Sequence, residues 1–538
     1  MLLLMRGPHL GAAPGTVFAE PPKQEHRQSA RRRAMEGVRP VSPWRSERVP
    51  TGVPNLDRLT DGGLSQGDLV LIVGGPGTGK TILAAQMAFH WAALGRGVLW
   101  LVTLGEPNEK FLAHLSEMRF FDPRQVGVTF HLVNVSRFLP EGLEAQLRVI
   151  RDTVRSGEYD FVVIDGFQGF RGFLAGPSEV RVFLSDLSSE LALGGITLVV
   201  TTDADPGQHW ESPEFTAADS LIQLDRVVIG GRQRRQIQVS KMRGRVAVGG
   251  WHSFSVDSAG VSIHPRIESV LPPSEPVSAA ERQALGVPGL DHLLDGGVPR
   301  GTLTLVAGAP GTGKGFLADH FLAEGLRQGQ ACLYVCVAKT PADLLTRADR
   351  FGLPLRQGEA SGKLHLRTYE PARFDPDECA AHVLDAVESY GIQRLAVDDV
   401  GPLVEDIGAS GRTLEYLTAL AGHLRGHGVT TMITSQQPEL FSAALNLRTL
   451  PLAEVADNVI ILRFSDADGR LRRKLAVVKT RYSYHRPLTA EMLIEEGTLD
   501  VVPHPRPEEA RPESASYYAE QVTQHEGESL RPEQRLRP

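Results

Sequence analysis

The sequence predicts an α/β protein made of two tandem domains, each with a mostly parallel central sheet flanked by helices. A glycine-rich loop motif occurs twice, and its first residue, Gly74, returns as Gly308, 234 residues later. Each copy follows a short apolar segment typical of a buried strand and precedes a segment of helical composition. Because strands and helices alternate through both halves, the pattern favours parallel sheets covered by helices.

The first loop motif predicts a phosphate-binding site. It reads Gly74-Gly75-Pro76-Gly77-Thr78-Gly79-Lys80-Thr81 and fits the pattern G-x-x-x-x-G-K-[ST]. Residues 69–73 are the expected strand and residues 82–94 the expected helix. The glycines let successive N–H groups converge on phosphate oxygens, and the helix start adds its positive end. We expect Lys80 to reach the β- and γ-phosphates of ATP and Thr81 to bind Mg²⁺.

The second copy keeps the lysine of the motif and loses its hydroxyl. It reads Gly308-Ala309-Pro310-Gly311-Thr312-Gly313-Lys314-Gly315, between an expected strand at 303–307 and an expected helix at 316–328. Lys314 still predicts nucleotide binding. Because Gly315 has no hydroxyl, we expect Mg²⁺ to be held more weakly there, or through water alone.

A second candidate magnesium ligand stands at the end of an apolar strand. The segment 161–165 ends in Asp165, the Walker B pattern in which an aspartate orients Mg²⁺ or its water. The counterpart in the second half is Asp398.

A candidate base follows another predicted strand, at 97–103. Glu106 is placed to polarise the attacking water, although a helix-capping or solvated glutamate is the alternative. The same place in the second half reads Ala338-Lys339, without a carboxylate. The second copy therefore lacks both the hydroxyl ligand and the base, and we expect it to hydrolyse ATP poorly.

Each half ends with a basic strand terminus, Lys241 and Arg243 in the first and Lys479 and Arg481 in the second. Cations so distant in sequence from their own loop are candidates to reach a neighbouring subunit's nucleotide, as an arginine finger does. Spacing alone favours the alternative, a solvated strand end. The stretch 232–235 is expected to be a solvated hairpin turn rather than a nucleic-acid site.

Composition bounds the domain organisation. We expect a disordered basic extension at 1–46 (with Met35 as a second candidate start), a first domain at 47–266, a linker at 267–277, a second domain at 278–503 and a disordered tail at 504–538. More than half of the residues between 51 and 81 are identical to their partners in the second half, which indicates duplication of a whole domain.

Charge and cysteine content bound the class of protein. A net charge of −7 argues against a protein that coats nucleic acid over its whole surface. Cys332 and Cys336, two of three cysteines, lie about 13 Å apart along one predicted strand, too far for a disulfide, so we expect core packing and a reducing, cytoplasmic compartment. No apolar run reaches the 18 or more residues of a membrane span, so no membrane contact is expected.

The combination of motifs resembles the KaiC family of RecA-like P-loop NTPases, over roughly residues 47–503. The resemblance is carried by Thr51-Gly52-Val53-Pro54-Asn55-Leu56-Asp57, Asp61-Gly62-Gly63, the loops, Leu104-Gly105-Glu106, Asp165 and Lys241-Met242-Arg243-Gly244. It implies two RecA-like domains and a hexameric ring of identical subunits with ATP between them. It also implies that Lys241 and Arg243 touch the neighbour's nucleotide.

Two departures from the family pattern stand out. The family has paired glutamates after the second strand, whereas this chain has Gly105-Glu106 in the first half and Ala338-Lys339 in the second. The family also phosphorylates an adjacent Ser-Thr pair in its second domain. The matching pair here is Ala453-Glu454, which cannot accept phosphate by that chemistry.

The leading hypothesis is a cytoplasmic, Mg²⁺-dependent ATPase that hydrolyses ATP in its first domain and uses the second for nucleotide binding and regulation, in a ring with an unidentified signalling partner. Three alternatives remain. One is a serine/threonine autokinase with other acceptors. Another is a RecA-like DNA-dependent motor, which the lack of a basic stretch interleaved with aromatics disfavours. The third is a non-hydrolysing module in which nucleotide controls assembly.

Overall fold

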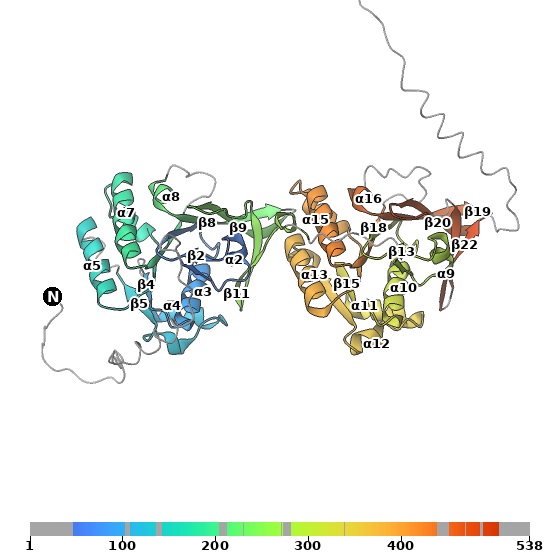
Figure 1. The fold of residues 1–538 in the computed structure, drawn as a ribbon, viewed down its shortest axis with the longest axis horizontal. Coiled ribbons are helices and arrows are strands. Elements are labelled where there is room, and N and C mark those ends of the chain that lie inside the picture. Colours follow the sequence, from blue (N-terminus) through green and yellow to red (C-terminus); the bar gives the residue numbers. More distant parts are fainter. Residues whose placement is uncertain are drawn as a thin grey trace, which may run out of the picture. The chain divides into compact units, whose positions relative to one another are not determined.

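The computed structural model describes residues 47–102, 108–135, 142–203, 212–229, 231–270, 272, 281–337, 339–437, 451–467, 470–484, 488–495 and 497–504. The expected extension and almost all of the expected tail lie outside these residues. The described chain divides into two compact units (Figure 1). One comprises the residues up to Val227 with Arg234–His264, and the other comprises Val228–Gln233 with the residues from Pro265 on. The two units contain the predicted tandem α/β domains.

The first unit is built on a nine-stranded sheet with the order β11-β10-β9-β8-β3-β7-β6-β4-β5. Its parallel part comprises β3 (Leu69–Gly74), β4 (Val98–Val102), β5 (Phe130–Asn134), β6 (Phe161–Asp165), β7 (Thr197–Asp203) and β8 (Ser220–Ile229). Antiparallel pairing joins β9 (Arg232–Met242), β10 (His252–Asp257) and β11 (Gly260–His264), which extend the sheet from β8.

Helices cover both faces of this sheet (Figure 1). On one face lie α3 (Lys80–Ala93) and α4 (Asn108–Ser116), and on the other α5 (Leu143–Arg155) and α7 (Pro177–Leu193). Val70 and Ile72 pack with the α3 layer, whereas Leu71 and Val73 pack with the α5 and α7 layer. Since successive side chains of a strand point to opposite faces, β3 must be apolar throughout to fill both layers.

The second unit repeats this plan with the strand order β16-β15-β17-β18-β14-β19-β20-β21-β22. Its strands are β14 (Leu303–Gly308), β15 (Cys332–Val337), β16 (Leu364–Tyr369), β17 (Arg394–Asp398), β18 (Thr430–Gln436), β19 (Asn458–Ala467), β20 (Arg470–Thr480), β21 (Thr489–Glu495) and β22 (Thr498–His504). One face carries α10 (Lys314–Arg327), α11 (Pro341–Arg350) and α12 (Leu355–Ala360), and the other α13 (Pro376–Tyr390), α14 (Gly401–Gly408) and α15 (Thr413–Gly426).

Shorter elements complete both units. They are β1 (Arg48–Val49), β2 (Leu64–Ser65), α2 (Leu56–Leu59), α6 (Gln168–Arg171) and α8 (Pro213–Ala217) in the first, and β12 (Arg282–Gln283), β13 (Val298–Pro299), α9 (Pro288–Leu293) and α16 (Pro451–Val455) in the second.

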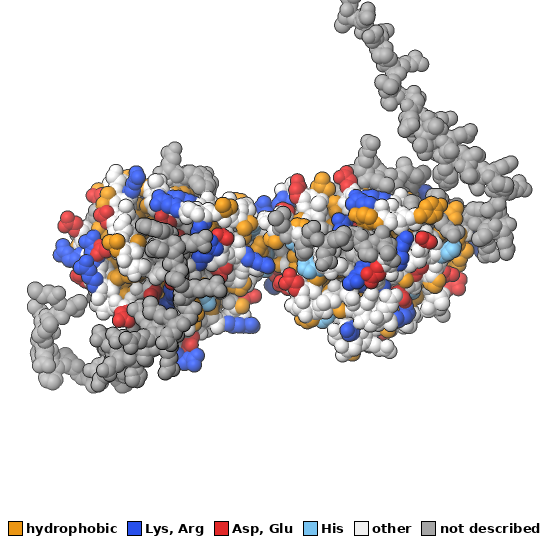
Figure 2. Space-filling view, in the orientation of Figure 1, with side chains coloured by type: hydrophobic (Ala, Val, Ile, Leu, Met, Phe, Trp, Pro, Cys, Tyr) orange, Lys and Arg blue, Asp and Glu red, His pale blue; other side chains and the backbone are white. Residues whose placement is uncertain are grey.

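The predicted mostly parallel sheets flanked by helices are confirmed, and so is the core position of Cys332 and Cys336, both buried on β15. The prediction of a turn at 232–235 was wrong, because these residues begin strand β9 and alternate in exposure along it. None of the helices in the described residues is long and apolar enough to cross a membrane. On the face seen in Figure 2, acidic and basic side chains are interspersed.

A buried guanidinium at the start of β17 connects several segments of the second unit through hydrogen bonds. Arg394 is fully buried, and every acceptor that it meets is neutral. Nη1 donates to the carbonyls of Ala284 (2.7 Å) and Phe321 (3.0 Å). Nε and Nη2 donate to the side-chain oxygens of Gln330 (2.6 Å), Gln283 (2.9 Å) and Gln328 (3.2 Å). The segment before α9 and the end of α10 therefore depend on one side chain.

We predict that Arg394→Met destabilises the second unit by about 2–4 kcal/mol, because it leaves buried acceptors without donors. The matched control Arg327→Met removes an exposed arginine of α10 and should change stability by less than about 0.5 kcal/mol. All five tryptophans lie at or before Trp251, so their fluorescence reports the first unit alone. Denaturant unfolding followed by circular dichroism should show the loss while the fluorescence transition stays in place. Equal shifts in both signals would contradict this role.

Candidate functional site

The predicted phosphate loop joins the carboxyl end of β3 to α3. Gly77 (φ 72°) and Gly79 (φ 109°) adopt left-handed backbone conformations that favour glycine. The Thr78 hydroxyl closes the loop by donating to the carbonyl of Gly75 at 2.9 Å. In the second loop Gly311 and Gly313 have matching φ angles of 78° and 105°. Both copies therefore have the backbone needed to cradle phosphate.

The first residue of each loop must be glycine, because the backbone of the neighbouring strand leaves no space for a side chain. A Cβ on Gly74 would lie 2.4 Å from the carbonyl oxygen of Leu224 on β8, and one on Gly308 would lie 2.3 Å from that of Leu462 on β19. The next position is different, because a Cβ on Gly75 would meet nothing within 4 Å. The second loop indeed carries Ala309 at that position.

Both loop lysines fold back over their loops. Lys80 Nζ donates to the carbonyls of Gly74 (2.8 Å) and Gly75 (3.0 Å) and pairs with Asp203 Oδ1 at 2.6 Å. Lys314 Nζ makes the same two backbone bonds, to Gly308 (2.8 Å) and Ala309 (2.9 Å). The ammonium groups thus lie where phosphate oxygens would replace these acceptors.

The strand registers identify what stands opposite each loop. Gly74 is opposite Asp203 in the pairing of β3 with β7, whereas Gly308 is opposite Gln436 in the pairing of β14 with β18. At this register position the first site has a carboxylate, which pairs with Lys80, and the second has a neutral amide. The largest charge effect on Lys314 comes instead from the carboxylate of Asp399.

In the first unit, the expected metal ligands lie together. Thr81 Oγ1 donates to Asp165 Oδ1 at 3.2 Å, and Thr201 Oγ1 donates to the same oxygen at 2.6 Å. Burial raises the pKa of the Asp165 carboxyl, and the two hydroxyls offset only part of this rise. Hydroxyls beside a buried carboxylate whose pKa stays raised fit Mg²⁺, which prefers oxygen ligands. Glu106, the expected base, lies outside the described residues, at 103–107.

In the second unit, the equivalent carboxylate is surrounded by cations and donors. Asp398 Oδ2 accepts from the Tyr334 hydroxyl (2.9 Å) and from Lys339 Nζ (2.6 Å), and Oδ1 accepts from Thr434 Oγ1 (2.9 Å). Arg347 Nη2 lies 3.7 Å from Oδ2. Burial alone would raise the pKa of Asp398, but Lys339 and Arg347 outweigh burial and lower it.

Arg347 is itself fixed by a second buried carboxylate. Its Nε and Nη2 donate to Asp319 at 2.6 and 2.8 Å, in a bidentate pair with a side chain that has no exposed surface. Counted from the shared loop lysine, Asp319 of α10 corresponds to Ala85 of α3. Helix α4, which packs on the equivalent face of the first unit, carries no arginine. Among the residues that the structure describes, the first unit has no counterpart of this pair.

The strand registers also refine the comparison of the two copies. Val102 is opposite Asp165, and Cys336 is opposite Asp398, so Val102 and Cys336 are equivalent. Counting three residues on, Gly105 matches Lys339, one residue earlier than the motif comparison gave. Glu106 then matches Thr340, which caps α11 by accepting from the backbone N–H of Asp343 at 3.3 Å.

The basic pair of the first unit lies against α8. Lys241 Nζ donates to the carbonyls of Phe215 (3.0 Å) and Thr216 (3.1 Å), and Arg243 Nη1 binds Asp219 Oδ1 at 3.0 Å. Asp219 Oδ2 in turn accepts from the backbone N–H of Leu69, at the start of β3. Arg243 therefore lies at the amino end of the strand whose carboxyl end carries the loop.

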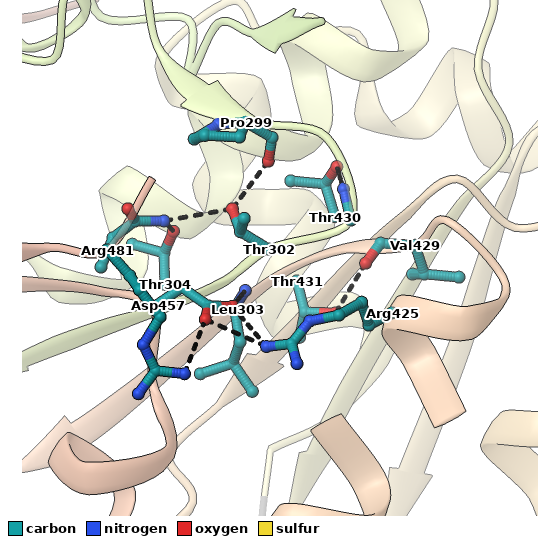
Figure 3. Close-up of polar contacts among 12 residues, drawn as sticks. Pro299, Thr302, Leu303, Thr304, Arg425, Val429, Thr430, Thr431, Asp457 and Arg481 are labelled. Carbon is teal, nitrogen blue, oxygen red and sulfur yellow. Dashed lines mark hydrogen bonds and ion pairs between the residues drawn. The ribbon is translucent and has the colours of Figure 1, made fainter. Parts of the chain in front are cut away.

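The second unit repeats this arrangement, as Figure 3 shows around the buried Asp457. Asp457 accepts from the N–H of Leu303 at 3.0 Å, from Arg425 Nη2 at 2.9 and 3.0 Å, and pairs with Arg481 at 3.4 Å. Lys479 Nζ donates to the carbonyls of α16. A strand of six residues separates Leu303 from Gly308 by about 16 Å, so Arg481 lies far from its own loop.

Four residues that the structure places at the two sites belong to none of the sequence motifs: Asp203, Asp319, Arg347 and Tyr334. Asp203 is recognisable in the sequence, because it is a carboxylate that directly follows the strand-like segment 196–202. Asp319 is also recognisable, because it is a charge inside a helix whose first copy has alanine. The pairing of Arg347 with Asp319 cannot be recognised in the sequence, because it depends on how α11 packs on α10.

The chain is similar to known proteins over most of its length. The family model described as "ATPase: KaiC" matches residues 49–268 and 284–506. Circadian clock protein KaiC3 of Synechocystis sp. is 27% identical over 472 residues, which cover 85% of this chain and 92% of that protein. Circadian clock oscillator protein KaiC of Picosynechococcus sp. is 25% identical over 464 residues, 84% of this chain and 89% of that protein. The KaiC of Thermostichus vulcanus is 23% identical over 467 residues, 85% and 89% of the two chains.

We predict that Gly74→Ala abolishes nucleotide binding at the first loop and destabilises the first unit by about 1–3 kcal/mol, because its methyl group would overlap the Leu224 carbonyl. The matched control is Gly75→Ala, which adds the same methyl group into open space and should bind nucleotide like the wild type. Nucleotide titration and the tryptophan unfolding transition check both variants. Equal behaviour of the two variants would refute the packing argument.

Proposed function

Since the chain belongs to the KaiC family of ATPases, we propose that its first domain is the Mg²⁺-dependent hydrolytic unit and its second a nucleotide-binding, regulatory unit. The observation that carries this proposal is the contrast at the ends of β6 and β17. Asp165 is accompanied by the Thr81 hydroxyl, whereas Asp398 is engaged by Lys339 and Arg347 beside Gly315, which has no side chain.

In this proposal, different residues of the first domain bind the phosphates, hold the metal ion and activate the attacking water. The N–H groups of the Gly75–Lys80 loop hold phosphate oxygens, and Lys80 releases its backbone acceptors to bind the β- and γ-phosphates. Thr81 and Asp165 would hold Mg²⁺, which when bound neutralises charge that develops on the phosphates. Glu106 polarises the attacking water.

The basic pair acts in trans in this proposal. Arg243 is fixed near Leu69, about 16 Å of strand from Gly74, so it cannot serve its own loop. The side chain of Arg243 is 60% exposed and so available to a neighbouring subunit. A hexameric ring of identical chains in the cytoplasm would place Lys241 and Arg243 of one subunit against the nucleotide of the next. The relatives are named as circadian clock proteins, which supports a signalling or regulatory use of this chain, for which we propose a further, unidentified protein partner.

We predict that Lys80→Ala lowers steady-state phosphate release from ATP with Mg²⁺ by about 100-fold or more, because the charge that holds the transferred phosphoryl group is lost. Lys314→Ala, its exact counterpart in the second loop, should retain most of the turnover. Loss of turnover in both variants would refute the assignment of hydrolysis to the first domain alone.

We predict that Arg243→Ala lowers turnover by about 10³-fold, the scale of an arginine finger, while Arg481→Ala, with the same local contacts in the second unit, has a small effect. Mixing the inactive Arg243→Ala and Lys80→Ala chains tests action in trans. A mixed ring pairs an intact loop with an intact arginine from its neighbour and should regain part of the activity. Mixtures that stay inactive, although size-exclusion chromatography shows mixed rings, would refute a role across subunits.

A further inference from the structure

We propose that the second site binds a nucleoside triphosphate without a divalent metal ion, with the cationic side chains of Lys339 and Arg347 in the place that the first site offers to Mg²⁺. The inference rests on the proposed nucleotide binding by the second domain. It goes further by assigning what replaces the metal.

The space beside the second loop is already filled by a guanidinium. A Cβ built on Gly315 would lie 3.1 Å from Nη1, 3.3 Å from Cζ and 3.4 Å from Nη2 of Arg347. The side chain of a threonine, which is the first domain's residue at this position, extends beyond its Cβ and would meet Arg347 directly. Loss of the hydroxyl and gain of the arginine are therefore one structural change.

The carboxylate that would bind the metal is committed to other partners. Asp398 accepts from Tyr334, Lys339 and Thr434, and its side chain is only 4% exposed. A metal ion at Asp398 would lie beside the ammonium of Lys339 and the guanidinium of Arg347. Arginine cannot lose its charge, so Mg²⁺ would meet repulsion that no change of protonation at Arg347 relieves.

Displacing Arg347 to admit a metal is also unfavourable. Its guanidinium forms a bidentate pair with Asp319, whose side chain has no exposed surface. If Arg347 moved, a buried carboxylate would remain without its partner, which is among the most destabilising changes in a protein interior. The cation is thus built into the fold of the second unit.

The balance of charge supports the same assignment. Among the described residues beside the first loop, two cations (Lys80 and Arg226) stand with two carboxylates (Asp165 and Asp203), so no positive charge is in excess there. Among its described residues the second site instead has four cations and three carboxylates: Lys314, Lys339, Arg347, Arg473, Asp319, Asp398 and Asp399. It has an excess of positive charge without a metal, and its cations have the donors that recognise phosphate.

The decisive experiment uses the full chain with Lys80→Ala, which leaves the second loop as the only intact one. A non-hydrolysable ATP analogue is titrated by calorimetry in buffer with Mg²⁺ and in buffer with EDTA. We expect one site per chain with dissociation constants that agree within about threefold. Binding with Mg²⁺ but not with EDTA would overturn the inference and leave nucleotide binding by the second domain intact. Absence of binding in both buffers would overturn both.

A second experiment transfers the first domain's residues into the second site of the same background. The changes are Gly315→Thr, Asp319→Ala, Lys339→Gly and Arg347→Ala, which remove the buried pair as a unit. We expect affinity in EDTA to fall by about tenfold or more, the scale of losing charge-assisted contacts, and Mg²⁺ to restore it. Arg350→Ala, an exposed arginine of the same helix, is the matched control and should leave binding unchanged. A folded fourfold variant that still ignores Mg²⁺ would overturn the inference.

Discussion

A buried carboxylate at the end of one strand is the constraint on which each domain's site depends. The strand registers place Asp165 and Asp398 at the same position of their sheets, beside a phosphate loop. Burial disfavours the ionised form of a carboxylate unless positive charge or donors compensate. In the first domain two hydroxyls compensate only in part, so the site is suited to take a cation from solution. In the second, Lys339 and Arg347 compensate fully.

This constraint explains why the second copy departs from the first at several positions together. Arg347 near Asp398 leaves little room for a side chain at position 315, and it needs a carboxylate of its own to be held. Asp319 supplies that carboxylate where the first copy has Ala85. Gln436 stands in place of Asp203, and its amide donates to Asp399, the carboxylate that acts on the lysine of the second loop. The substitutions form a connected set rather than scattered loss of function.

The sequence predicts features that depend on residues close together in the chain, and it does not predict contacts between residues that only the folded structure brings together. The loops, their strands and helices, and the two strand-end aspartates lie within short segments whose geometry local residues determine, and the tandem parallel sheets were predicted from them. The strands that end at the two basic pairs are β9 and β20, as the sequence predicts, although β9 already begins within the stretch 232–235, for which the sequence favours a turn. No motif marks the antiparallel strands β10, β11, β21 and β22. Arg347 and Asp319 are 28 residues apart and meet only because α11 packs against α10, so no spacing rule reveals them.

The position of the basic pairs links the fold of one domain to assembly. Arg243 and Arg481 are each held by an aspartate that also binds the first backbone N–H of the loop-bearing strand. The strand therefore carries the phosphate loop at one end and a fixed cation at the other. Because a strand is too stiff and too long to bring its two ends together, a single domain cannot use both on one nucleotide. In the proposed ring, a subunit would offer its cation to one neighbour and its loop to another, so that the site is complete only between subunits. The hydrolysis proposed for the first domain would then depend on assembly as well as on its own residues.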